Sequence, residues 1–156
     1  MRNGSNGIIY RHTFSGDCPS TSSASAIRIN RWRVAYGLAT HPSDDSVIYG
    51  ADWGNSKIYK YTLNASKSGI SSTVSKGVRR NKQSSATNTF IYYPGGVHVD
   101  TTNNRVILAD LNKSAVQFFD LNLGWIKELG GSLATRMTGA HEAIQAIVCL
   151  LYTSDA

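Results

Sequence analysis

Residues 37–64 read GLATHPSDDSVIYGADWGNSKIYKYTLN, and residues 96–122 read GVHVDTTNNRVILADLNKSAVQFFDLN. The two stretches align when one residue near Gly50 is treated as an insertion. Identical residues then recur at Gly37/Gly96, Val47/Val106, Ile48/Ile107, Ala51/Ala109, Asp52/Asp110, Ser56/Ser114, Leu63/Leu121 and Asn64/Asn122. A repeat of about 58 residues with three strand-like runs in each copy indicates a repeat architecture.

Each copy predicts a series of short β-strands. We expect strands over 34–40, 47–51, 57–63 and 70–74 in the first copy, and over 96–100, 105–109, 115–121 and 125–129 in the second, with weaker strands over 7–14 and 26–30 before them. Several strands are apolar on both faces, as at Ile58 and Tyr59. An antiparallel sheet with one wet face does not need this pattern, whereas a sheet between two others does. The predicted fold class is therefore all-β, a partial β-propeller of about two to three four-stranded antiparallel blades.

The length of the chain suggests a piece of a ring. A propeller needs about four to eight blades, and 156 residues hold roughly two and a half at this spacing. The tail CLLYTSDA resembles read-through into a sequencing adapter, so we interpret it as non-native. The expected divisions are 1–30 as the outer strands of a truncated blade, 31–90 as a blade with a basic Ser/Thr-rich insertion, 91–131 as a second full blade, 132–148 as the start of a further blade and 149–156 as the tail.

Most of the net charge of +6 is local. Between Ala65 and Phe90 there is no acid, and the cations are Lys67, Lys76, Arg79, Arg80 and Lys82. A cationic patch can attract nucleic acid, so the basic patch over 76–82 is a candidate nucleic-acid contact. Because it lacks interleaved aromatic residues on which bases stack, we interpret it as a solvated loop.

The sequence leaves the compartment open. No segment has the run of about 18 apolar residues that a membrane span needs, so we expect no membrane span. The start of the chain lacks the apolar core of a signal peptide, which fits either a cytosolic protein or a missing N-terminus. In the second case an extracellular or periplasmic location would follow if that N-terminus held a signal peptide. Cys18 and Cys149 define neither a disulfide framework nor a zinc site.

Both copies resemble known propeller repeats. The first carries Leu38, Ala39 and the run IYGADWGNSKIY over 48–59, which resembles the LDL-receptor class B, or YWTD, repeat. The second carries Pro94, Gly96, Val97, Val99, Asp100, Ala109, Asp110, the run VQFFDL over 116–121 and Gly124, and it resembles an NHL repeat. These resemblances imply a six-bladed, TolB-like propeller. The YWTD tetrad stands here as YGAD over 49–52, so its Trp and Thr are absent.

Two sets of residues are candidates for chemistry. Asp52 and Asp110 each follow a second strand, where an aspartate usually accepts backbone N–H bonds, so we predict structural carboxylates. His98 and Asp100 share a face of a predicted inner strand that lines the central channel. Some lyases and lactonases of this fold hold a metal there. One imidazole with one carboxylate is fewer than the three protein ligands of a catalytic zinc, so we assign no metal and no cofactor, although His141 would add a second imidazole if a third blade starts near it.

Bulky residues gather on the loops at one end of the predicted blades. Aromatic residues and arginine commonly anchor interfaces, and this loop face binds partners in many propellers. The predicted binding residues are Arg31, Trp32, Trp53, Asn55, Tyr92, Tyr93, Asn112 and Lys113. The alternative for Trp32 and the tyrosine pair is packing between blades, because tryptophan is usually largely buried.

Three functional hypotheses follow. The first is a binding module whose loop face takes a protein or glycan. The second is an enzyme, a metal-assisted lactonase or lyase with its site in the channel; convergent His, Asp and Glu on several inner strands would distinguish it. The third is an inactive piece whose open edges and apolar faces aggregate. We favour the binding module.

Overall fold

The computed structural model describes residues 7–11, 25–29, 32–33, 35–77, 91–111, 113 and 115–130. The regular elements in these ranges are ten β-strands: β1 (Gly7–Arg11), β2 (Ser25–Ile29), β3 (Ala35–His41), β4 (Asp44–Asp52), β5 (Lys57–Leu63), β6 (Ile70–Lys76), β7 (Pro94–Asp100), β8 (Arg105–Asp110), β9 (Ala115–Asp120) and β10 (Trp125–Gly130). The segments expected over 132–148 and 149–156 lie outside the described residues.

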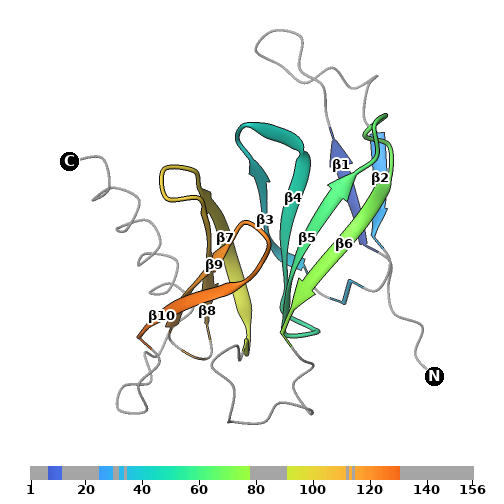
Figure 1. Cartoon of the computed structure of the whole chain (residues 1–156). Coiled ribbons are helices and arrows are strands. Elements are labelled where there is room, and N and C mark those ends of the chain that lie inside the picture. Colours follow the sequence, from blue (N-terminus) through green and yellow to red (C-terminus); the bar gives the residue numbers. More distant parts are fainter. Residues whose placement is uncertain are drawn as a thin grey trace, which may run out of the picture.

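The strands form three antiparallel sheets. Strands β3-β4-β5-β6 make one four-stranded sheet, here called blade A, and strands β7-β8-β9-β10 make a second, blade B. Strands β1 and β2 pair with each other and are called the outer pair. Figure 1 shows blade A standing between blade B and the outer pair. In both blades each strand lies beside its neighbours in sequence, as in the blades of a β-propeller.

Two apolar layers hold the three sheets together. One lies between the blades and includes Tyr49 and Ile58 from blade A with Val106 and Phe119 from blade B. The other lies between blade A and the outer pair and includes Ile27, Ile48 and Tyr61. Consecutive residues of β4 thus point into different layers. The prediction that blade A packs on both faces is confirmed for its second and third strands, β4 and β5.

The predicted strands agree closely with the structure. The range 57–63 is reproduced without change in β5, and the other described strands overlap their predicted ranges. The largest difference is at residues 42–45, whose composition (Pro-Ser-Asp-Asp) predicts a turn. Strand β4 already begins at Asp44. The side chain of Asp44 accepts hydrogen bonds from both N and Oγ of Ser46, which stabilises this early part of the strand.

The strand register corrects the alignment of the two copies. Thr40 pairs with Ile48 in blade A, and Val99 pairs with Val106 in blade B. The extra residue therefore lies in the connection between β3 and β4 and not near Gly50. The register shifts there, beside Thr40, whereas β7 and β8 pair without a shift from Val97 to Asp100. Such an irregularity changes the face to which later residues point, so Ile48 is the counterpart of Val106, and the pairing of Val47 with Val106 is wrong.

The corrected register reveals an exchange of side-chain volume between the two layers. Gly50 is the counterpart of Leu108, because they pair with Leu38 and Val97 respectively. A Cβ added at Gly50 would lie 2.5 Å from Cζ2 of Trp32, so the indole occupies the space that a side chain would need. In blade B the corresponding layer holds Leu108 together with Ile91. Each layer thus combines a residue before the inner strand with one on the second strand: Trp with Gly, or Ile with Leu.

This exchange predicts compensation between two substitutions. Gly50→Leu alone should lower the free energy of unfolding by about 1–3 kcal/mol through overpacking, and Trp32→Ile alone by about 2–4 kcal/mol through the cavity it leaves. The double variant should lose at least about 1 kcal/mol less unfolding free energy than the sum of the two single losses, because its layer then resembles that of blade B. Urea unfolding of the four proteins measures this, and strictly additive costs would show that the two sites do not share one space.

Candidate binding face

An aspartate at the end of the second strand anchors the start of each blade. In blade A, Asp52 accepts backbone N–H bonds from Arg33 at 3.2 Å and Asn55 at 3.1 Å. In blade B, Asp110 accepts them from Tyr92 at 2.7 Å and Tyr93 at 2.9 Å. Both carboxylates are fully buried. The prediction of structural carboxylates is confirmed, and their bonds fix the backbone that leads into the inner strands β3 and β7.

The carboxylate of Asp110 lies in a particularly dry environment. Nε2 of the buried Gln117 also donates to it, at 3.1 Å. Burial raises the pKa of Asp110 from 3.8 to about 6, even though the N–H bond from Tyr92 and the charge of Lys113 act in the opposite direction. The charged form is therefore held at an energetic cost, which its hydrogen bonds only partly offset.

This raised pKa predicts a pH dependence of stability. Between about pH 4 and pH 6 the folded chain binds more protons at Asp110 than the unfolded chain. The stability that protonated Asp110 contributes to the free energy of unfolding is fully present below pH 3.8. It is lost as pH rises through about 6, a fall on the order of 3 kcal/mol. Asp110→Asn should remove this fall from the profile of unfolding free energy against pH.

Asp45→Asn serves as the matched control. This carboxylate is exposed, and its pKa is lowered by its hydrogen bond to Lys67. The control should keep the decline between pH 4 and pH 6. Equal profiles for the wild type and Asp110→Asn across that window would contradict the assignment.

Three aromatic rings lie together on the loop face beside these anchors. Trp53, in the turn between β4 and β5, stacks on Tyr93 with the ring centroids 4.6 Å apart and the planes at 17°. Tyr36 on β3 lies against Trp53 at 6.1 Å. We call Tyr36, Trp53 and Tyr93 the aromatic stack; Tyr92 meets Tyr93 edge-on at 5.3 Å. The stack joins rings from both blades into one surface.

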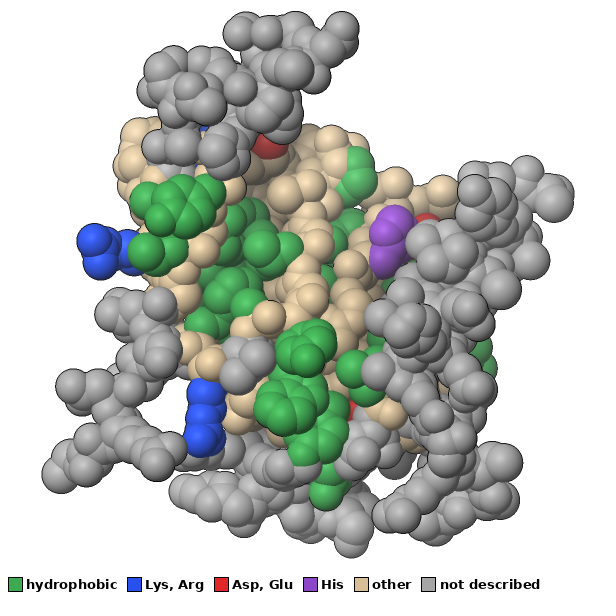
Figure 2. Space-filling view, turned by 180° about the vertical axis from the view of Figure 1, so that it is seen from behind, with side chains coloured by type: hydrophobic (Ala, Val, Ile, Leu, Met, Phe, Trp, Pro, Cys, Tyr) green, Lys and Arg blue, Asp and Glu red, His purple; other side chains and the backbone are tan. Residues whose placement is uncertain are grey.

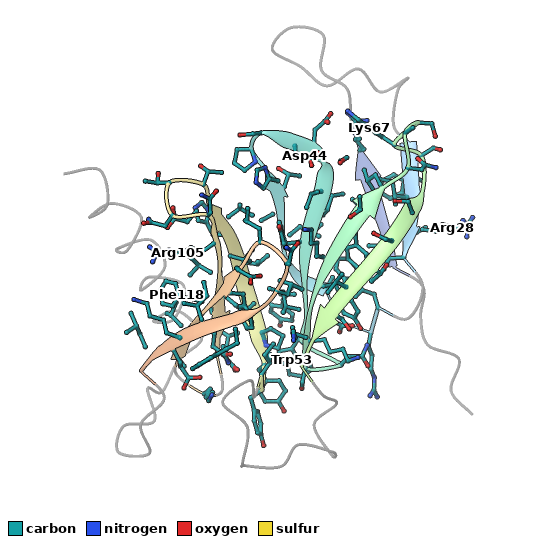
Figure 3. The ribbon with its side chains drawn as sticks, viewed as in Figure 1. Arg28, Asp44, Trp53, Lys67, Arg105 and Phe118 are labelled. Atoms are coloured by element: carbon teal, nitrogen blue, oxygen red, sulfur yellow. The ribbon has the colours of Figure 1, made fainter. Side chains whose placement is uncertain are left out.

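The aromatic stack is partly open to solvent. Tyr36 is 63% exposed, while Trp53 and Tyr93 are half-buried. Figure 3 places Trp53 at the end of the sheets where β4 turns into β5, and Figure 2 shows hydrophobic side chains at the surface in the same lower part of the molecule. A further bond, from Oγ of Ser56 to the carbonyl oxygen of Tyr92 at 2.7 Å, ties the two loops together.

The structure places the predicted binding residues in different environments. Trp53, Tyr92 and Tyr93 come together as described, and the side chain of Asn55 donates to Asp52. Lys113 forms an ion pair with Glu128. Trp32 is only 5% exposed and packs between blade A and the outer pair, so the packing alternative holds for this residue. Arg31 and Asn112 lie outside the described residues.

Sequence reasoning missed Tyr36. It precedes Gly37, the first identity of the repeat, and its counterpart in blade B is not aromatic. No signal in the sequence indicates it, because the spacing of Tyr36 from Trp53 does not show that this strand and this turn meet.

The channel residues do not assemble a metal site within the described ranges. His98 lies half-buried on β7, and Asp100 accepts bonds from Asn103 and Arg105. His41 accepts a hydrogen bond from the backbone of Ser43. No group of three His, Cys, Asp or Glu that could hold a metal occurs among the described residues, and His141 lies outside them. The described part of the chain also has no helix long and apolar enough to cross a membrane.

Comparison with known proteins supports the fold. No protein-family model matches the chain, and no curated protein matches it. Among solved structures it is similar to a luciferin-regenerating enzyme, a propeller, at 15% identity with a TM-score of 0.51 over 69% of this chain and 33% of that one. It is also similar to a protein described as exported, from Bacteroides fragilis NCTC 9343, at 11% identity with a TM-score of 0.43 over 83% of this chain and 30% of that one.

The chain thus spans about a third of the length of the solved structures that it matches. At such low identity the likeness concerns the fold alone. Together with the three stacked antiparallel sheets, it defines the chain as all-β with the architecture of a partial β-propeller.

Proposed function

We propose that this chain is a binding module, and that its ligand, a protein or a glycan, docks on the aromatic stack of the loop face. The observation that carries the proposal is the stack itself, which is partly exposed and spans two blades. Large aromatic side chains contribute much contact area with little loss of conformational freedom, which is why they anchor interfaces.

The support beneath the stack favours binding over packing alone. Asp52 and Asp110 fix the backbone on both sides, and Ser56 ties the loop of Trp53 to that of Tyr93. A rigid surface loses little entropy when a ligand binds. Exposed aromatic rings held in this way are costly to leave in water, and a ligand that covers them recovers that cost.

The complete ring is proposed to be six-bladed and of the YWTD or NHL type. Its support is the aspartate at the end of the second strand in both copies, which in each blade accepts a backbone N–H bond from the segment before the inner strand. The alternative of a metal-assisted lactonase or lyase rests on His98 and Asp100, and Asp100 is already engaged with Arg105. The described contacts therefore favour the binding module.

The test begins with a ligand search that needs no prior identity. The chain is screened against a panel of immobilised neutral oligosaccharides and against a random 12-residue peptide library. For any probe that binds, Trp53→Ala and Tyr93→Ala should each weaken affinity about tenfold to a hundredfold, as expected for the anchors of an interface.

Tyr10→Ala is the matched control, because Tyr10 is 61% exposed but lies on β1, in the outer pair. It should leave the affinity unchanged. Full affinity in both aromatic variants would remove the stack as the binding site. Failure of every probe in both sets to bind would count against a protein or glycan ligand.

A further inference from the structure

Blade A has an uncovered patch on its inner strand, with an exposed apolar side chain in it. Leu38 on β3 is 49% exposed, and Thr40 on the same face is also exposed. Their counterparts in blade B are covered: Val97 packs against the layer between the blades, and Val99 is only 4% exposed. Equivalent positions in two copies of one repeat thus have opposite environments.

The strands that pack against the inner strand of blade B indicate which element would cover the inner strand of blade A. Strand β7, which carries Val97 and Val99, lies against strands β3 and β4 of blade A. Ala39 and Tyr49 from these two strands belong to the same layer as Val99. An inner β-hairpin of the preceding blade is therefore what buries this part of a blade.

On the other side of blade A, only the outer half of the face is covered. Ile27 and Ile29 of β2 pack with Tyr61 and Leu63 of β5, and β2 lies against β6. Figure 1 shows the outer pair beside β5 and β6, with β3 on the side of β7. Within the described residues β1 pairs with β2 alone, so its other edge presents backbone N–H and C=O groups.

We propose that the inner half of this face, with Leu38 at its centre, is a docking site for a β-hairpin that adds to the free edge of β1. Its two strands continue the sheet of the outer pair by backbone hydrogen bonds, as in strand addition, and bury Leu38. The site is separate from the ligand proposed for the aromatic stack.

The contacts between the blades specify the sequence of that hairpin. A Cβ added at Gly37 would lie 2.4 Å from the carbonyl oxygen of Gly95, so the strand that meets the next blade needs a glycine at this point. The second strand needs a large side chain such as Tyr49, which is fully buried and donates its hydroxyl to the carbonyl oxygen of Leu121 at 2.8 Å. The pattern of residues 35–52, the β3–β4 hairpin, meets both requirements.

The test attaches a second copy of residues 35–52 ahead of Met1 of the full chain. Residues 1–6 then take the place of the four residues, 53–56, that join β4 to β5. The midpoint of thermal unfolding should rise by about 5–10 °C relative to a chain that carries a scrambled copy of the same composition. In the extended chain Leu38→Asp should remove most of this rise.

Leu38→Asp in the original chain is the control. If the substitution simply destabilised blade A, it would lower the midpoint equally in both chains. Leu38 is half-exposed there, so Leu38→Asp should shift the midpoint by no more than about 2 °C. Equal midpoints for the hairpin and scrambled extensions overturn the proposal. An equal effect of Leu38→Asp in both chains overturns it as well.

Discussion

Burial of apolar side chains on both faces of one antiparallel sheet is the interaction on which the rest of this structure depends. Blade A packs on both faces at its second strand, since Tyr49 enters the layer toward blade B while Ile48 enters the layer toward the outer pair. Removing either neighbouring sheet would expose one of these layers to water. The three sheets therefore stabilise one another, and their packing fixes the positions of the loops at their ends.

Hydrogen bonds to two buried carboxylates position the segments that lead into the inner strands. Asp52 and Asp110 are buried at the same point in their blades, and each accepts the N–H groups of the segment leading into its own inner strand. A buried carboxylate is tolerable only when such donors satisfy it. Asp52 also accepts the N–H group of Asn55, in the turn that carries Trp53, and Asp110 accepts that of Tyr93. The carboxylates that maintain the fold therefore also hold the proposed binding surface.

Much of this architecture was predictable from particular residues. The repeated Asp after each second strand predicted structural carboxylates. Apolar pairs such as Ile58 and Tyr59 predicted strands covered on both faces. The loop positions of Trp53 and Tyr93 predicted a common surface. The contact of Tyr36 with Trp53 was not predictable, because their spacing along the chain does not show how a strand and a distant turn meet.

By itself, the sequence determined the fold class, the order of the strands and the identity of the anchoring carboxylates, since these follow from local periodicity and from repetition. Only the tertiary structure decided the register between the copies, because an irregularity between β3 and β4 changes which face a residue occupies without altering the composition. It also decided that Trp32 is buried while Leu38 is half-exposed. Exposure depends on which sheet lies opposite a side chain, and no stretch of sequence contains both partners of that contact.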